Sequence, residues 1–196
     1  SRLQQLRSQI DPHFLFNTLN VILQTAGQEK AYRTQALITA LSHLLRYSLM
    51  SNDEQVPLAR EVRIVDEYYS IYHVRFGDRV KMVWRISDSL DLTETMVPSF
   101  ILQPIVENAF KHGISPVKPS FIHIKIYSSG PDTLSCSIEN SYFPKQRNDI
   151  SGSGIGLEQV QKRLDLIYPD KYEWTKGCDE NATVYKSILT IHTTTK

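Results

Sequence analysis

Residues Pro98–Gly113 read PSFILQPIVENAFKHG, and this stretch decides the fold of the second half of the chain. At 100° per residue, a helix over 98–112 gathers its apolar side chains on one half of its surface. The opposite arc, roughly 140° wide, carries four polar side chains: Glu107, Asn108, Lys111 and His112. The pattern predicts a helix that buries one face and presents a polar strip on the other.

This polar strip has two interpretations. Glu107 and Lys111 form an i, i+4 pair worth only about 0.2–0.5 kcal/mol, and a solvated face needs no function. Alternatively, the Asn108 amide oxygen is a ligand for magnesium, Lys111 and His112 bind phosphate, and the Glu107 carboxylate orders a water or polarises the attacking group. The second interpretation requires a phosphate-binding loop nearby.

A candidate loop is the run SGSGIGL at residues 151–157. Gly152, Gly154 and Gly156 let backbone N–H groups approach an anion, and Leu157 opens an amphipathic helix whose N-terminus supplies further donors. Flexible loops use the same pattern, so the run alone is weak evidence. A Rossmann site is disfavoured because the acidic residue expected about 20 positions downstream is not evident.

The first 50 residues have helical spacing. Apolar residues three and four apart predict a first helix that runs from Leu3 through Val21, Gly27 interrupts the pattern, and a second helix is predicted over 32–49. A lone hairpin buries too little apolar surface, so we expect a homodimer in which two copies form a four-helix bundle.

The polar stretch 51–55 predicts a boundary between a dimerising hairpin, residues 1–54, and a second domain, residues 55–196, in which Pro57 opens a helix. Beyond Gly77 the apolar period changes to two, which predicts strands. The expected strands lie near 80–86, 122–126, 134–138, 171–176 and 184–192, with helices around 98–112 and 156–167. Helices on one face of a mixed sheet make an α+β sandwich.

Composition excludes several function classes. Among 196 residues, 22 Lys and Arg face 21 Asp and Glu, so a net charge of +1 disfavours nucleic-acid binding. No stretch approaches 18 apolar residues and no signal-peptide plan is present, so this piece is not expected to insert in a membrane. Cys136 and Cys178 are expected to be reduced thiols, which suits a cytosolic setting.

The motifs together resemble two known patterns. The stretch around Asn108, the strand that ends at Asn140 and the glycine run resemble, in this order, the N-box, D-box and G-box of the GHKL ATP-binding fold. Residues 9–20, QIDPHFLFNTLN, are similar to the phospho-accepting box of LytS/YehU-type sensor histidine kinases. Smaller matches to that family are Leu44–Tyr47, Arg75-Phe76 and Arg163-Leu164.

The resemblance implies a function for each motif. ATP, with Mg²⁺ held by Asn108, would phosphorylate His13, and a response-regulator receiver domain would then take the phosphoryl group on an aspartate. Nucleotide contacts are implied for Lys111, His112, Asn140, the three glycines and Leu157. Family members usually carry membrane-spanning segments upstream, which implies the cytoplasmic side of an integral inner-membrane parent.

His13 has its own physical case. It borders the apolar seam of the first helix, with Asn17 four residues on along the same flank, although a buried structural histidine is the ordinary alternative. Pro12 either kinks a continuous helix or stands as its first residue behind an Asp11 N-cap. Both geometries expose the imidazole. A neutral imidazole has a ring nitrogen free to attack phosphorus.

Two positions depart from the family pattern. Phe14 follows His13 where many histidine kinases have an acid, so Asp11, Glu107 and solvent remain candidate proton acceptors. Strand parity puts Asn140, not Glu139, in the place of the adenine-binding aspartate. A neutral amide should bind adenine about fivefold more weakly than a carboxylate does.

These departures leave a second hypothesis open. The chain would then be a degenerate kinase that acts as a dimeric nucleotide-binding signalling scaffold. A GHKL ATPase acting on DNA or on client proteins is disfavoured, because it leaves the His13 box unexplained.

Overall fold

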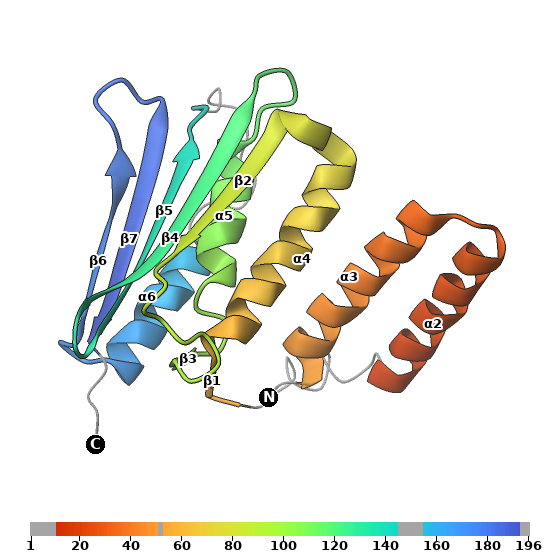
Figure 1. Cartoon of the computed structure of the whole chain (residues 1–196), viewed down its shortest axis with the longest axis horizontal. Helices are drawn as coiled ribbons and strands as arrows, with labels where there is room; N and C mark the ends of the chain where they lie inside the picture. The colour runs from red at the N-terminus through yellow and green to blue at the C-terminus, as the bar shows by residue number, and fades with distance from the viewer. Residues whose placement is uncertain (1–10, 51–52, 145–154, 193–196) are drawn as a thin grey trace. The chain divides into compact units, whose positions relative to one another are not determined.

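The computed structural model describes residues 11–50, 53–144 and 155–192 (Figure 1). The chain divides into two compact units, Ser1–Asp53 with Asp66–Arg75, and Glu54–Val65 with Phe76–Lys196. Helix α4, Leu58–Phe76, therefore contributes residues to both units. In the described ranges, no helix has both the length and the apolar character needed to cross a membrane.

The first unit contains a helical hairpin made of α2, Pro12–Gln28, and α3, Tyr32–Met50 (Figure 1). Asp11 caps α2, because its carboxylate accepts from the His13 N–H at 3.0 Å. Of the two predicted geometries, α2 has the one in which Pro12 opens the helix. The stretch before Asp11, including Leu3, lies outside the described residues.

A small apolar core holds the hairpin together. Phe16 and Leu19 of α2 are 8% exposed, and they pack with Ala26 and Ile38. The Arg46 guanidinium lies 4.5 Å from the Phe16 ring centroid, so a cation covers one edge of this core. Leu15, Leu23 and Leu45 pack against this core and are partly buried. Other apolar side chains of the two helices are exposed: Phe14, Val21, Ile22, Tyr32, Leu41, Leu49 and Met50.

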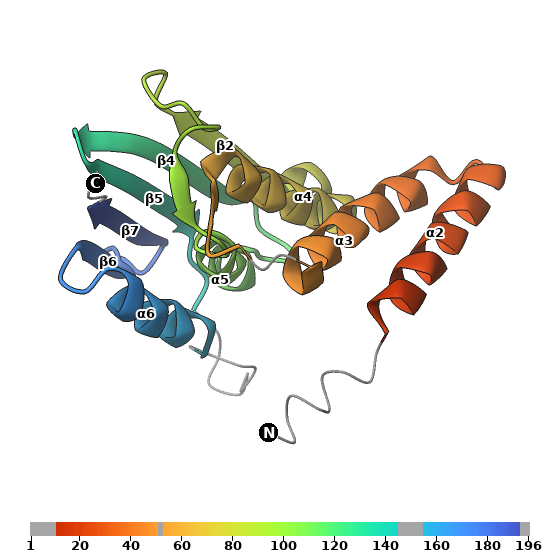
Figure 2. The same cartoon turned by 90° about the horizontal axis from the view of Figure 1, so that it is seen from below.

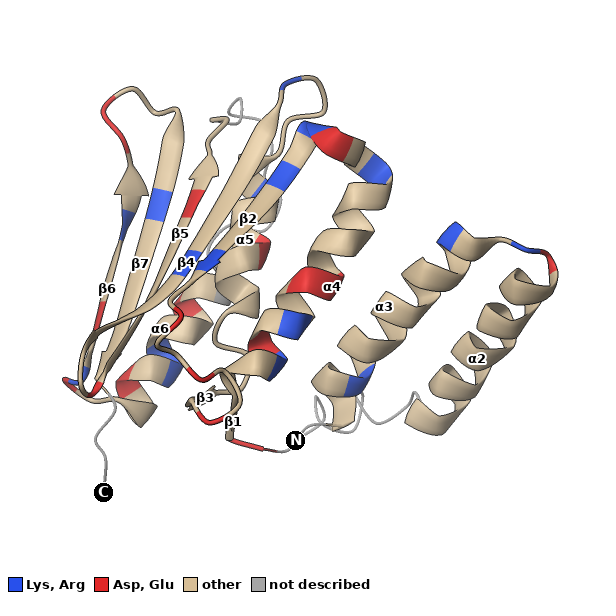
Figure 3. Ribbon diagram, in the orientation of Figure 1, with Lys and Arg blue, Asp and Glu red and all other residues tan. Residues whose placement is uncertain are grey.

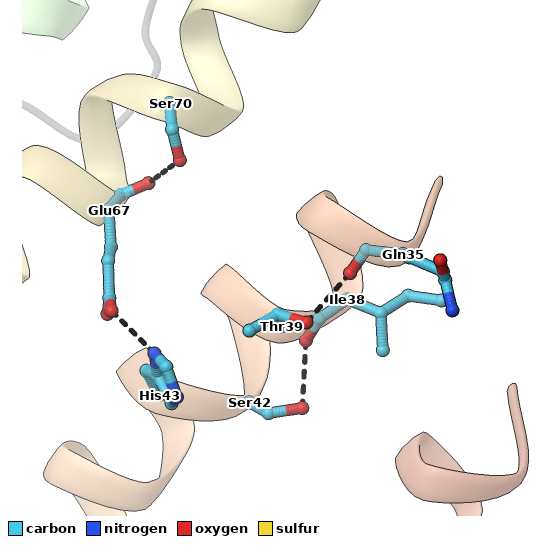
Figure 4. Close-up of polar contacts among 7 residues, drawn as sticks. All are labelled: Gln35, Ile38, Thr39, Ser42, His43, Glu67 and Ser70. Atoms are coloured by element: carbon cyan, nitrogen blue, oxygen red, sulfur yellow. Dashed lines mark hydrogen bonds and ion pairs between the residues drawn. The ribbon is translucent and has the colours of Figure 1, made fainter. Parts of the chain in front are cut away.

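The second half of α4 packs on α3 through a polar contact. His43 Nδ1 lies 2.5 Å from Glu67 Oε1, and the Ser70 hydroxyl donates to the Glu67 carbonyl oxygen at 2.7 Å (Figure 4). Ser42 donates to the carbonyl oxygen of Ile38 one turn earlier in α3. Residues 66–75 of α4 belong to the same unit as the hairpin, and this contact joins the two.

The second unit is built on a five-stranded sheet with the order β2-β4-β5-β7-β6. β2 and β4 pair in parallel, while the other three pairings are antiparallel. The strands are β2, Val80–Ile86; β4, Ser120–Gly130; β5, Thr133–Ser141; β6, Tyr172–Cys178; and β7, Val184–His192. Helices α5, Gln103–Gly113, and α6, Ile155–Ile167, lie on one face of this sheet (Figure 2). The predicted α+β sandwich with a mixed sheet is confirmed.

The core lies between the sheet and these two helices. Its strand residues alternate along the chain, and its helix residues recur every three or four positions. They include Ile122, Ile124, Ile126, Leu134, Ile138, Leu189, Ile105, Val106, Phe110, Val160 and Leu164, all buried. Each large side chain stabilises the fold by about 1.5–3 kcal/mol through burial.

Both cysteines are free thiols, as expected. Cys136 is buried in the core, and burial raises its pKa to about 12. Cys178 is exposed at the end of β6. The thiolate needed for oxidation is therefore suppressed at Cys136.

Two predicted helix starts are wrong. The helix expected from Pro98 begins at Gln103, because Met96–Pro98 forms β3 and pairs with β1, Gln55–Pro57. Likewise Pro57 ends β1 and does not open α4. In both places a strand that pairs far along the sequence overrides the local helical pattern.

Candidate active site

The polar strip of α5 faces away from the core, as its spacing predicts. Ile105, Val106, Ala109 and Phe110 are 1–3% exposed, whereas Glu107 is exposed. Asn108, Lys111 and His112 are partly exposed. Their polar groups are thus accessible to a ligand while the helix itself is anchored by its apolar half.

Asn140 lies at the end of β5 and points to the helix-covered side of the sheet. It shares that side with Ile138, while Glu139 points the other way and lies 3.9 Å from Lys186. The predicted strand parity is confirmed. Asn140 is 1% exposed, and its Nδ2 donates to the Ser141 carbonyl oxygen at 2.8 Å.

Ser141 joins the end of α5 to the sheet. Its hydroxyl donates to the Gly113 carbonyl oxygen at 2.5 Å and accepts from the Phe121 N–H at 3.1 Å. The C-terminus of α5 is therefore fixed beside Asn140. Sequence reasoning did not assign this role to Ser141, because the role depends on a contact between residues 28 positions apart.

Gly113 is required by this close approach. A Cβ there would lie 2.7 Å from Asn140 Nδ2 and 2.9 Å from the Ser141 backbone oxygen. We expect Gly113→Ala to lower the free energy of unfolding by about 1–3 kcal/mol, the usual cost of overpacking. Chemical denaturation would measure it. Gly177→Ala is the control, because nothing lies within 4 Å of its Cβ position; equal stability of the two variants would contradict the explanation.

A cavity of about 160 Å³ lies beside the polar strip. Its described lining comprises Asn108, His112, Tyr142, Leu157 and Tyr185. Asn108 and His112 come from α5 and Leu157 from α6. Three residues that the sequence singled out in two separate motifs thus meet in one hollow.

Two aromatic residues of this cavity were missed from the sequence. Tyr142 follows β5, and its ring centroid lies 6.1 Å from that of Tyr185 on β7. Tyr185 pairs with Asn140 across β5 and β7. Tyr185 can be identified as a cavity residue only from the register of β5 and β7, which no local sequence pattern predicts.

The Tyr185 hydroxyl is suited to donate a hydrogen bond. Burial raises its pKa above the ordinary value, and Cys178 and Tyr142 add to the shift. A tyrosine hydroxyl is protonated at neutral pH already at its ordinary pKa, and the rise extends this to more alkaline pH. The cavity therefore offers an aromatic wall with a polar edge, the combination that planar heterocycles favour.

The other predicted site residues are divided between the two units. His13 and Asn17 are exposed on α2, in the helical unit. Gly156 is the second residue of α6, whereas Gly152 and Gly154 lie outside the described residues. Across the described ranges, no group of three or more His, Cys, Asp or Glu side chains is arranged to hold a metal ion.

Comparisons with known proteins agree on one family. The histidine kinase family model matches residues 1–80. The sensor histidine kinase YpdA of Escherichia coli K12 is 33% identical over 177 residues, which are 86% of this chain and 31% of YpdA. BtsS of the same strain is 32% identical over 190 residues, 93% of this chain and 32% of BtsS. The chain thus spans about a third of the length of these curated relatives.

A solved structure shares the fold. The histidine kinase domain of the blue-light activated kinase of Erythrobacter litoralis EL346 superposes with a TM-score of 0.52 at 14% identity, over 96% of this chain and 92% of that domain. Sequence relatives, family model and fold all agree with the motifs. The chain belongs to the LytS/YehU-type sensor histidine kinases.

Proposed function

We propose that this chain is the kinase core of a two-component system, which phosphorylates itself on His13 from ATP and passes the phosphoryl group to a response-regulator aspartate. One observation carries the proposal: residues of the predicted N-box and G-box, Asn108, His112 and Leu157, line one cavity. The exposed His13 in the family's N-terminal box supplies the acceptor.

The cavity fits part of a nucleotide. Its volume of about 160 Å³ is below the roughly 300–1,000 Å³ that encloses a drug-sized ligand, so it suits one ring system. Tyr142, Leu157 and Tyr185 provide apolar and aromatic contact for a purine. Asn140, beside the cavity through its pairing with Tyr185, would accept from the adenine amine.

The phosphates would lie along the polar strip of α5. Asn108 fits magnesium by the chemistry of its amide oxygen, and Mg²⁺ usually takes few protein ligands because it keeps waters and substrate phosphates. Bound there, the ion would neutralise charge on the transferring phosphoryl group. Lys111 and His112 would steady the phosphates, and Gly152, Gly154 and Gly156 would give backbone N–H donors.

His13 would act as the nucleophile. Its backbone N–H is held by the Asp11 cap at 3.0 Å, which fixes the first turn of α2 while the imidazole stays exposed. Asn17, one turn on, would orient the ring. Nitrogen attacks the γ-phosphorus, the bond to the β-phosphate oxygen breaks, and ADP leaves; Asp11, Glu107 or solvent would take the imidazole proton.

The hairpin surface supports a homodimer. Helix α2 contains no Asp, Glu, Lys or Arg (Figure 3). Several large apolar side chains of α2 and α3 are 40–69% exposed: Phe14, Val21, Ile22, Leu41 and Leu49. A second copy would cover them in a four-helix bundle.

The location that we propose for this chain is the cytoplasmic side of the inner membrane, as part of a membrane-anchored parent protein.

Labelling with γ-³²P-ATP and Mg²⁺ tests the proposal. We expect the chain to acquire a label that is labile in acid and stable in base, as a phosphohistidine is. A chain that binds ATP but stays unlabelled would favour the alternative, a degenerate kinase acting as a dimeric nucleotide-binding scaffold. Asn140 in place of aspartate and Phe14 in place of an acid are the observations that favour this alternative.

Asn140→Asp should change affinity and stability in opposite directions. A charged acceptor strengthens the adenine bond by about 1 kcal/mol, so ATP affinity should rise about fivefold. The same change removes the Nδ2 donor from the Ser141 carbonyl oxygen, which should lower the free energy of unfolding by about 1–3 kcal/mol. Titration calorimetry and denaturation measure the two quantities. An affinity that fails to rise would rule out the adenine contact.

A further inference from the structure

The connection between β3 and α5 is held by two side chains of opposite charge. It consists of residues 99–102, of which Ser99, Ile101 and Leu102 are 5%, 2% and 3% exposed. Glu61 reaches it from α4 and Arg163 from α6. We propose that Glu61 and Arg163 are positioning residues for phosphoryl transfer, which fix the start of α5 and thereby place Asn108; this rests on the function proposed above.

Glu61 accepts from the backbone immediately before the first turn of α5. The N-cap residue Leu102 has no side-chain cap of its own, but its N–H donates to Glu61 Oε2 at 3.1 Å. A capping box normally draws its glutamate from the third residue of the same helix. Here the glutamate belongs to another helix, and its side chain is fully buried, at 0% exposure.

The second Glu61 oxygen fixes the shape of the connection. It accepts from the Phe100 N–H at 2.6 Å. Phe100 has φ of 60°, in the left-handed region that bulky residues rarely adopt. One carboxylate therefore satisfies two amides of a strained turn and places negative charge at the N-terminus of α5, where the helix dipole favours it.

Arg163 ties the same connection to α6. Its guanidinium donates to the Ser99 carbonyl oxygen, and its Nη2 lies 3.2 Å from the Ser99 hydroxyl. A guanidinium has the planar fork for two acceptors, which an ammonium lacks. Leu157 of α6 lines the cavity together with Asn108 and His112 of α5, so Arg163 links α6 to the connection that leads into the other helix of this lining.

This tie governs one end of the proposed site. Asn108 lies six residues after Leu102, about 9 Å along a rigid helix axis, so a shift at the helix start carries Asn108 with it. Asn140 lies beside the opposite end of α5, where the Ser141 hydroxyl donates to the Gly113 carbonyl oxygen. That bond keeps the C-terminal end of the helix in place when its start shifts. Loss of the tie should therefore disturb magnesium and phosphate binding more than adenine binding.

The test compares Arg163→Met with Lys162→Met in the whole chain. Both remove one cation from α6 and keep an unbranched side chain, but Lys162 is exposed and is the control. For each we would measure the melting temperature, the autophosphorylation rate, and the affinity for a fluorescent ATP analogue with Mg²⁺ and with EDTA. Glu61→Gln tests the second side chain that holds the connection, and Glu173→Gln, at an exposed position, is its control.

The expected result is a selective loss. In Arg163→Met, the factor by which Mg²⁺ strengthens binding of the ATP analogue should fall about tenfold. The autophosphorylation rate should fall about 100-fold, the loss expected when reacting groups are misplaced by about 1 Å. Affinity in EDTA should stay within twofold of wild type. Arg163→Lys, which keeps one donor, should recover part of the loss, and the Lys162 control should match wild type.

A purely structural role gives a different result. If Arg163→Met melts earlier but keeps its rate and its Mg²⁺ dependence, or loses affinity equally with and without Mg²⁺, the proposal is overturned. A wild-type chain that binds no nucleotide would instead overturn the proposed function. Hydrogen exchange of the backbone amides of residues 103–113 distinguishes failure of this proposal from failure of the proposed function. If exchange is unchanged in both Arg163→Met and Glu61→Gln, these side chains do not fix the start of α5, whether or not the chain is a kinase.

Discussion

Replacing His13 with alanine should reduce the acid-labile phosphoryl label to background. The imidazole nitrogen is the only group proposed to take the phosphoryl group, so no slower route replaces it. The fold should survive, because the side chain is exposed and alanine is a better helix former than histidine. Autoradiography after acid and base treatment gives the answer, with circular dichroism as a check on the fold.

The control for this variant is His123→Ala. His123 is exposed on β4, and its ring packs only against the Phe121 ring among the contacts described, at 4.7 Å between centroids. It should label as wild type does. A His13→Ala chain that still acquires the label would show that another residue accepts phosphate, and the proposed mechanism would fail.

Replacing Asn108 with alanine should lower the rate by about 100-fold or more. A bound divalent ion contributes several kcal/mol to stabilising charge in the transition state, and each 1.4 kcal/mol is a factor of ten in rate. Removal of the amide takes away its proposed protein ligand. Single-turnover labelling at several Mg²⁺ concentrations should show both a lower rate and a higher Mg²⁺ requirement.

Asn108→Asp separates ligation from packing. A carboxylate is also a hard oxygen ligand for magnesium, so this variant should keep far more activity than Asn108→Ala. Asn181→Ala, at an exposed position in the turn between β6 and β7, controls for loss of an amide elsewhere. Equal loss in the alanine and aspartate variants would contradict a ligand role.

The sequence identified the elements with strong local signals. The period of 3.6 over 103–113 and the period of two over 122–126 fixed which residues face the core, since burial of alternate or facing side chains dominates local structure. Parity along β5 also placed Asn140 on the inner side correctly. Such signals are local, so they do not depend on which distant segment becomes the neighbour.

Other features required contacts between distant segments. Pro98 and Pro57 end strands because β1 pairs with β3. The residues around neither proline show a local pattern that predicts this pairing. Tyr185 enters the cavity only through the register of β5 and β7. Gly113 leaves no room for a Cβ because Asn140 and Ser141 approach it closely, and that contact joins segments far apart in the sequence.

The sequence by itself determined the family, the α+β class, the exposed His13 and the polar strip that carries Asn108, because motif spacing and hydrophobic period are properties of neighbouring residues. Only the tertiary structure decided which side chains meet around the cavity and which charges hold the start of α5. Glu61 and Arg163 lie far from residues 99–102 in the chain, and a hydrogen bond across such a separation depends on how helices and strands pack.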